Sequence, residues 1–278
     1  MHKTSLIALS LAALPALALA QGRGGRGGRG GAPAPPAGPP ILLVPDRVWD
    51  GSDGPPHDGW VVLVRGDKIE AVGTKSEVNA PADAQTITLA GTTLIPGLIE
   101  GHSHLLLHPY NETSWNDQVL HEPLALRVAR ATNHARAALL AGFTSTRDLG
   151  TEGAGYADVG LRDAINQGII PGPRMQVATR AIVVTGEYAP KGFAPEYVDA
   201  IPQGAEEADG PDGISHVVRD QIKHGADWIK IYADYRWGPN GEAMPGPTQD
   251  EFNLIVNIAK SSGRGVAAHA TTAEGMKR

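Results

Sequence analysis

This sequence of 278 residues contains no cysteine. The chain therefore cannot form disulfides, bind metal through thiolates, use a cysteine nucleophile or carry an N-terminal lipoprotein anchor. Any metal must be bound by histidine, by a carboxylate or by a modified lysine.

Long runs of charge of one sign are also missing. The chain has 24 Lys and Arg against 30 Asp and Glu, a formal net charge of -6, and the two signs are interspersed. Nothing in this balance favours nucleic acid or an anionic membrane as a partner, so a small polar substrate fits better. A nucleotide-binding G-x-G-x-x-G after the first strand of the α/β part is absent too.

No apolar run reaches the roughly 20 residues of a membrane-spanning helix. Residues 1–20 instead resemble a secretory signal, with His2 and Lys3, then a short apolar stretch and a small-x-small end at Ala18 to Ala20. We expect cleavage after Ala20 and a soluble product, periplasmic or secreted, without membrane contact.

Residues 21–40 are rich in glycine, arginine and proline and read as a linker, because this composition cannot bury enough apolar surface to fold. The alternative is a nucleic-acid-binding RGG segment around Arg23, Arg26 and Arg29. An export signal in front of it argues against that alternative.

Two folded parts are expected after the linker. Residues 41–96 form short apolar strands separated by turns, typical of one part of a small β-sandwich, with a tight hairpin at Gly66 to Lys68. Residues 97–278 alternate strands with amphipathic helices, which predicts parallel βαβ units. The expected strands are 97–104, 142–150, 173–179, 227–234 and 265–270, and the expected helices are 119–140, 156–167, 213–224 and 249–262.

The first α/β strand ends in the pattern H-x-H, formed by His102 and His104. Alternate residues of a strand share a face, so both imidazoles point the same way as Glu100. In a barrel they would converge at the C-terminal rim, where the active sites of barrel enzymes form. Two converging imidazoles there could bind a metal ion. Surface or core histidines produce the same pattern, so the motif by itself leaves both interpretations open.

Two further candidates follow on later strands. Lys230 shares a face with Trp228 and Tyr232, and burial would favour its neutral, nucleophilic amine; the alternative is a lysine paired with a carboxylate such as Asp234. His269 ends the fifth strand, above Gly265 and Ala267, whose small side chains would leave room for metal and substrate. These candidates fall in chain order at the ends of the first, fourth and fifth strands.

At these residues the sequence resembles the amidohydrolase superfamily, within the branch of imidazolonepropionase-related and Xaa-Pro dipeptidase (prolidase-like) enzymes. The carrying segments are residues 93–106, 142–150, 228–234 and 266–276. The resemblance implies an α/β fold, a TIM (β/α)8 barrel of which about five strands are present, preceded by a small β-sandwich module. It covers residues 41–278 and does not single out one substrate.

The resemblance also implies the chemistry. It implies that His102 and His104 bind one divalent ion, that His269 helps to bind a second, and that Lys230 is carboxylated by CO2 so that its carbamate bridges them. Zinc is the expected metal, and a metal-activated hydroxide would attack a C–N amide bond. Lys230 and His269 are then the catalytic candidates as well as ligands.

The sequence departs from the family pattern in one respect. The family expects another ligand histidine after the sixth strand and an aspartate after the eighth, and neither position occurs in this chain. A complete barrel takes about 250 residues. We therefore expect an unclosed sheet with exposed edges, poorly soluble and inactive by itself.

Other residues have more open roles. Tyr232 and Arg236 are candidates for substrate binding, although Tyr232 could equally fill the barrel. Glu100 is a candidate to support the ligands, and Asp148 could brace a ligand histidine, pair with Arg147 or cap a helix. Residues 184–212 are too long for a simple connector. The remaining histidines of this part are expected at the surface: His108, His121, His134, His216 and His224.

Three functions remain open. The favoured one is hydrolysis of dipeptides (Xaa-Pro-like) or N-acyl amino acids, and the second is hydrolysis of a cyclic amide, as by imidazolonepropionase. The third is a non-catalytic or inactive truncated product. A homo-oligomer is possible, and the metal cannot be chosen from imidazole and carbamate ligands alone.

Overall fold

The computed structural model describes residues 38–278, so the predicted signal peptide and all but the end of the predicted linker lie outside the described residues. The chain divides into two compact units after Gly97. Across the described residues, no helix is both long and apolar enough to cross a membrane.

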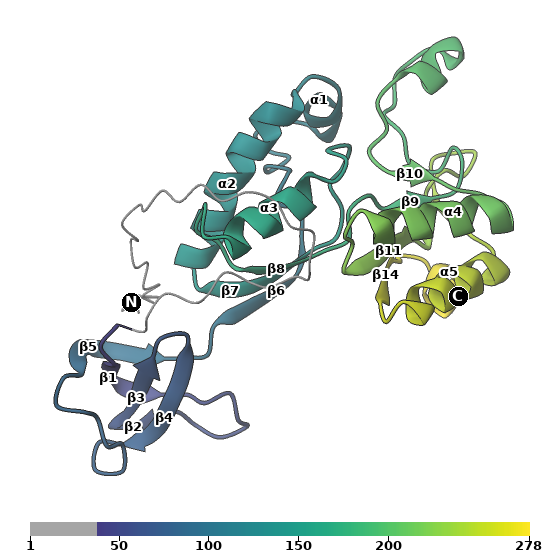
Figure 1. The fold of residues 1–278 in the computed structure, drawn as a ribbon. Coiled ribbons are helices and arrows are strands. Elements are labelled where there is room, and N and C mark those ends of the chain that lie inside the picture. Colours follow the sequence, from purple (N-terminus) through teal and green to yellow (C-terminus); the bar gives the residue numbers. More distant parts are fainter. Residues whose placement is uncertain (1–37) are drawn as a thin grey trace, which may run out of the picture. The chain divides into compact units, whose positions relative to one another are not determined.

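The first unit is built of strands only. They are β1 (Ile41–Val48), β2 (His57–Asp58), β3 (Trp60–Arg65), β4 (Lys68–Thr74) and β5 (Gln85–Leu94). The sheet order is β2-β1-β3-β4, with β5 parallel to β1 and the other pairs antiparallel (Figure 1). Gly66 turns the β3–β4 hairpin at a φ of 61°, a conformation that glycine adopts without strain. Leu42, Val61 and Leu63 form its core with Val78.

The second unit contains the five expected parallel strands. These are β6 (Leu98–Ser103), β7 (Phe143–Asp148), β8 (Arg174–Val177), β11 (Trp228–Tyr232) and β14 (Gly265–His269). β6 pairs with β7 and β7 with β8, while β11 pairs with β14 in register. The Asp227 amide donates to the Val177 carbonyl at 2.8 Å and joins the two groups of strands. The strand order thus follows the chain order, as in a (β/α)8 barrel.

The predicted third strand is shorter than expected. It ends at Val177, and Thr179 then takes a φ of 61°, where the chain turns toward β9 (Ile182–Val183). β9 pairs with β11 and with β10 (Glu206–Glu207). The long segment that follows β8 therefore contributes strands of its own, together with the 3-10 helix Pro195–Ala200.

Helices alternate with these strands along the chain. They are α1 (Trp115–Leu120), α2 (Leu124–Leu140), α3 (Ala157–Asn166), α4 (Gly210–Lys223), α5 (Gln249–Ser261) and α6 (Ala273–Lys277). The single helix predicted over 119–140 is wrong, because the chain breaks between α1 and α2 at Pro123, which lies just before the first turn of α2. Proline disfavours the helical conformation in the residue before it, so a continuous helix cannot pass this point.

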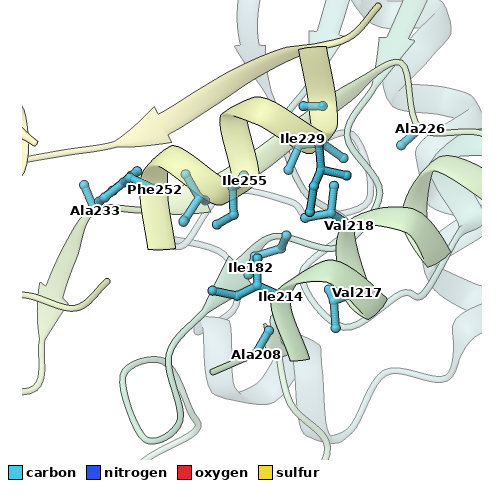
Figure 2. Close-up of a cluster of buried hydrophobic side chains, with 13 residues drawn as sticks. Ile182, Ala208, Ile214, Val217, Val218, Ala226, Ile229, Ala233, Phe252 and Ile255 are labelled. Carbon is cyan, nitrogen blue, oxygen red and sulfur yellow. The ribbon is translucent and has the colours of Figure 1, made fainter. Parts of the chain in front are cut away.

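The largest core lies between β11 and the helices that follow and precede it. Ile229 and Ile231 are fully buried and face α4 and α5, as their place in the strand predicts. Figure 2 shows Ile229 near Val218 of α4 and Ile255 of α5. A second core lies under α2 and α3, around Ala131, Ala135 and Val177. Both of these cores lie on the helix side. The opposite face of β11 carries Trp228, Lys230 and Tyr232, and Tyr232 belongs to a further cluster with Tyr188.

The outer strand β6 has an open edge among the described residues. It pairs with β7 alone, and Ile99 is 75% exposed although its place in the strand is that of a core residue. β14 likewise pairs with β11 alone in this part of the chain. The predicted exposed edges are thus present.

Candidate metal centre

His102 lies near the end of β6 and His104 directly follows that strand, and their ring nitrogens lie close together. Their Nε2 atoms lie 3.2 Å apart. The Nδ1 atom of His104 lies 2.9 Å from the Gly150 carbonyl oxygen, to which it can only donate, so the neutral ring has its lone pair on Nε2. Two nitrogens about 2.0–2.1 Å from a tetrahedral zinc ion are roughly 3.3 Å apart. The pair therefore fits two positions of one metal site.

Lys230 adds a third nitrogen. Its side chain is only 1% exposed, and its Nζ lies 3.4 Å from the Nε2 of His102. Burial lowers the pKa of Lys230 to about 8, with a further contribution from Arg147 and an opposing one from Glu152. The ammonium is still the major form at pH 7, but the neutral, nucleophilic amine is far more populated than in an exposed lysine, whose pKa is 10.5.

Asp234 is not the partner of Lys230. It is fully buried and accepts hydrogen bonds from the backbone amides and the hydroxyls of Thr271 and Thr272, at 2.7 to 3.0 Å. Although burial raises the pKa of Asp234, these hydrogen bonds lower it below its ordinary value. The alternative of a Lys230–Asp234 pair is therefore wrong, because the carboxylate ties down the loop after β14.

His269 lies at the end of β14, opposite Tyr232 in the β11–β14 register. The two rings stack with centroids 4.7 Å apart. Burial and the charge of Lys230 lower the pKa of His269, and burial with Lys230 and the neighbouring histidines lowers that of His102 to about 4. Both rings are therefore neutral at pH 7, the form that binds metal.

The space expected beneath His269 is filled. A Cβ at Gly265 would come within 2.4 Å of the Trp228 ring, so that indole occupies the position that we expected to be open. Arg147 lies over the same ring at 4.5 Å, and the indole donates to Gln176 at 2.8 Å. A metal bound by the two histidines and Lys230 would therefore lie above this layer.

Glu100 and Asp148 support the strand ends through the backbone. Glu100 accepts a hydrogen bond from the amide of His102 at 2.9 Å. Asp148 accepts from the amide of Leu105 at 2.7 Å, and burial together with Asp158 raises its pKa well above the ordinary value. Asp148 thus holds the chain just after His104 instead of the ring itself. Arg147 donates to the Gly101 carbonyl and does not pair with Asp148.

Arg236 and the other histidines lie away from these groups. Arg236 ends β12 (Asp234–Arg236), which pairs with β13 (Ala243–Pro245), and its side chain is exposed, so its substrate contact stays a prediction. The surface assignment of His108 is wrong: it is 8% exposed and lies 2.9 Å from Glu122. Sequence position alone did not reveal that Glu122 and Gln118 enclose it.

Sequence reasoning missed a buried aromatic wall and its carboxylate. Tyr188 lies 4.8 Å from Tyr232 and 4.6 Å from Tyr235, ring to ring, and Trp115 packs against it at 5.0 Å. Glu152, 2% exposed, accepts from both Trp115 and Tyr188. The segments that carry these residues lie far apart in the sequence, and only the fold brings them together.

The buried carboxyl of Glu187, next to Tyr188 in the chain, makes the stability of the protein depend on pH. Glu187 is 2% exposed, one of its oxygens has no hydrogen-bond partner, and burial followed by the charge of Asp234 raises its pKa to about 7. Because the folded-state pKa lies above the unfolded one, ionisation costs stability as pH rises from about 4.5 to about 7, and the cost stays constant above that range.

Glu187→Gln is therefore expected to stabilise the protein at pH 8, by on the order of 3 kcal/mol, and to change stability little at pH 5. Urea unfolding of the wild type and the variant at pH 5 and at pH 8 measures the two stability changes. An equal gain at pH 5 and pH 8 would show that ionisation of Glu187 is not the cause.

The sequence matches the family described as Amidohydrolase family over residues 93–277, more than half of the chain. The chain belongs to the amidohydrolase family. Among the described residues, no group of three or more His, Cys, Asp or Glu side chains could hold a metal ion. Amidohydrolases generally use divalent ions, and here the third converging group is a lysine, whose protonated ammonium has no lone pair to offer a metal.

Known proteins of the family resemble this amidohydrolase over most of its length. Ochratoxinase from Aspergillus niger is 31% identical over 255 residues, which is 82% of this chain and 48% of that protein. The structure of a prolidase with N-methylphosphonate-L-proline is 29% identical, with a TM-score of 0.69, and that of a Xaa-Pro dipeptidase with bound methionine is 27% identical, with a TM-score of 0.70. This chain covers 57% and 58% of those two chains, and they cover 85% and 86% of it.

Proposed function

We propose that this amidohydrolase uses two divalent ions, zinc being the expected one, to hydrolyse the C–N bond of dipeptides such as Xaa-Pro, or of N-acyl amino acids. The observation that supports it most is the convergence of the nitrogens of His102 and His104, at the end of β6, with that of Lys230 in β11. The likeness to a prolidase, a Xaa-Pro dipeptidase and ochratoxinase favours this substrate class.

Each residue would contribute a definite step. The neutral amine of Lys230 would attack the carbon of CO2: an N–C bond forms, one C=O π bond opens onto its oxygen, and the nitrogen loses one proton to solvent. The product is a carbamate anion in place of a buried cation. His102 and His104 would bind one ion through Nε2, and His269 would help to bind the second. Divalent ions at this place supply a Lewis acid and lower the pKa of water.

Tyr232 is the candidate for holding the substrate beside them. It stacks on His269, and burial together with the charge of Glu152 raises its pKa well above that of a free tyrosine, so its hydroxyl stays protonated. A protonated hydroxyl can donate a hydrogen bond to a substrate carbonyl or carboxylate. The wall formed by Tyr188 and Tyr235 would enclose an apolar side chain on the same side.

Metal content and substrate range test this proposal together. The full-length protein is expected to bind about two zinc-like ions per chain, and His102→Ala is expected to lose at least one. His121→Ala is the matched control, because the side chain of His121 is 73% exposed and lies on the surface near Asp117. Elemental analysis after dialysis measures the metal.

For the substrate, we expect turnover of dipeptides or N-acyl amino acids in a direct screen, lost in His102→Ala and kept in His121→Ala. A correctly folded protein free of metal would contradict the metal-dependent mechanism. Metal without turnover of either substrate class would contradict the substrate assignment and leave the metal site standing. We expect the 278 residues by themselves to be inactive, because the further ligand histidine and the aspartate of the family are not among them.

A further inference from the structure

Glu152 occupies a position that a glutamate rarely adopts. It follows β7 and has a φ of 49°, in the left-handed region, between Gly150 at 146° and Gly153 at 85°. Such a backbone conformation costs of order 1 kcal/mol or more for a residue with a side chain. Its carboxylate is also buried, at 2% exposure, which adds the cost of removing an anion from water.

The two oxygens of Glu152 face different parts of the site. Oε2 accepts a hydrogen bond from Trp115 Nε1 at 2.9 Å and another from the Tyr188 hydroxyl at 2.7 Å. Oε1 lies 3.8 Å from Nδ1 of His104, the nitrogen that donates to the Gly150 carbonyl. One carboxylate therefore contacts the aromatic wall and stands directly behind a candidate metal ligand.

A role in folding alone would not require a charge here. Two hydrogen bonds from Trp115 and Tyr188 could be accepted by a neutral amide oxygen just as well. The one buried arginine nearby, Arg127, donates instead to the carbonyls of Leu106 and Thr151 and leaves the carboxylate without a direct ion pair to it. The Glu152 side chain is thus held at a strained position, with Oε1 3.8 Å from Nδ1 of His104.

We propose that Glu152 is a positioning residue of the metal centre that acts through His104. Its charge polarises the Nδ1–H bond, which strengthens the Nε2 lone pair as a metal ligand, as carboxylates behind metal-bound histidines do. Its second oxygen fixes Trp115 and Tyr188, so the same side chain couples the ligand to the wall that faces the substrate. This inference rests on the metal-dependent function proposed above.

Glu152→Gln in the full-length protein tests the charge with little change of shape. We expect the affinity for Zn2+, measured by competition with a chelator, to fall about tenfold or more. The visible absorption of the Co2+-substituted protein should shift as well. Glu112→Gln is the matched control, because the side chain of Glu112 is 62% exposed, and it should match the wild type in both measurements.

Two further variants separate the charge from the wall. Trp115→Phe removes one hydrogen bond to Oε2 but keeps the anion, so it should keep metal affinity and raise KM. Glu152→Asp keeps the carboxylate but moves it away from His104, because aspartate is one methylene shorter. It should therefore weaken metal binding less than Glu152→Gln does. If Glu152→Gln does not fold, Glu152→Asp is the variant that tests the proposal.

The outcomes of this experiment are distinguishable. If the wild type binds no metal, the proposed function fails. If it binds metal and Glu152→Gln binds with the same affinity and the same Co2+ spectrum, the role of Glu152 in the metal centre is refuted and the metal site remains. If the glutamine variant does not fold, wild-type affinity and spectrum in Glu152→Asp would equally refute that role.

Discussion

In the full-length protein, Lys230→Met is expected to abolish the proposed hydrolysis while stabilising the metal-free form. Loss of the amine removes the group that would become the bridging carbamate, so kcat/KM should fall on the order of a thousandfold or more. The stability change has the opposite sign, because the 1% exposed lysine has a pKa lowered to about 8, first of all by burial. Below pH 8 the folded state carries the full penalty of that shift, and methionine fills a similar volume without it.

The expected gain is about 2–3 kcal/mol at pH 7 in the absence of metal and CO2, shrinking as the pH rises from 8 toward 10.5. Urea unfolding of chelator-treated protein measures it, and intact-mass analysis of the untreated wild type should show the added mass of CO2. Lys260→Met is the control, since Lys260 is exposed in the last turn of α5. A Lys230→Met variant with wild-type turnover would exclude the bridging role.

Asp234→Ala is expected to cost the most stability of any single change near the site. The carboxylate accepts from two amides and two hydroxyls of Thr271 and Thr272, and it is fully buried. Its removal leaves those donors without partners, for a loss of about 3–5 kcal/mol in the free energy of unfolding. The loop that follows His269 would be released, so His269 should lose its place as well.

Thermal unfolding measures this loss, and hydrogen exchange at the amides of Thr271 and Thr272 locates it. Asp212→Ala is a suitable control, because Asp212 is an exposed carboxylate in the first turn of α4 and should matter by no more than about 0.5 kcal/mol. Unchanged protection of the two threonine amides in Asp234→Ala would contradict the role assigned to this carboxylate.

Periodicity predicted much of the fold because it depends on neighbours in the chain. Alternation along 227–234 is enough to place Ile229 and Ile231 toward the helices and Lys230 on the other face, and the structure confirms that division. Helix ends were less well predicted. The break before α2 could have been predicted from Pro123, which lies just before its first turn. The two histidines of the H-x-H pattern were predicted to point the same way, and their Nε2 atoms do meet.

Contacts between distant segments could not be predicted in this way. Nothing near Gly265 in the sequence says that Trp228 fills the space above it, and nothing near Glu152 says that Trp115 and Tyr188 donate to it. The same holds for Asp234, whose partners lie 37 and 38 residues away. Burial is a property of the packed chain, and so are the pKa values that follow from it.

By itself, then, the sequence determined the parallel strand–helix order, the placement of His102, His104 and His269 at or just after strand ends, the face of β11 that carries Lys230, and the absence of thiolate ligands. Local stereochemistry fixes these features, since side chains alternate along a strand and cysteine is absent. Only the tertiary structure decided that Glu152 stands behind His104, that Asp234 binds the threonines after β14 instead of Lys230, and that Trp228 fills the space at Gly265. Those features depend on packing between segments that the chain brings together only when it folds.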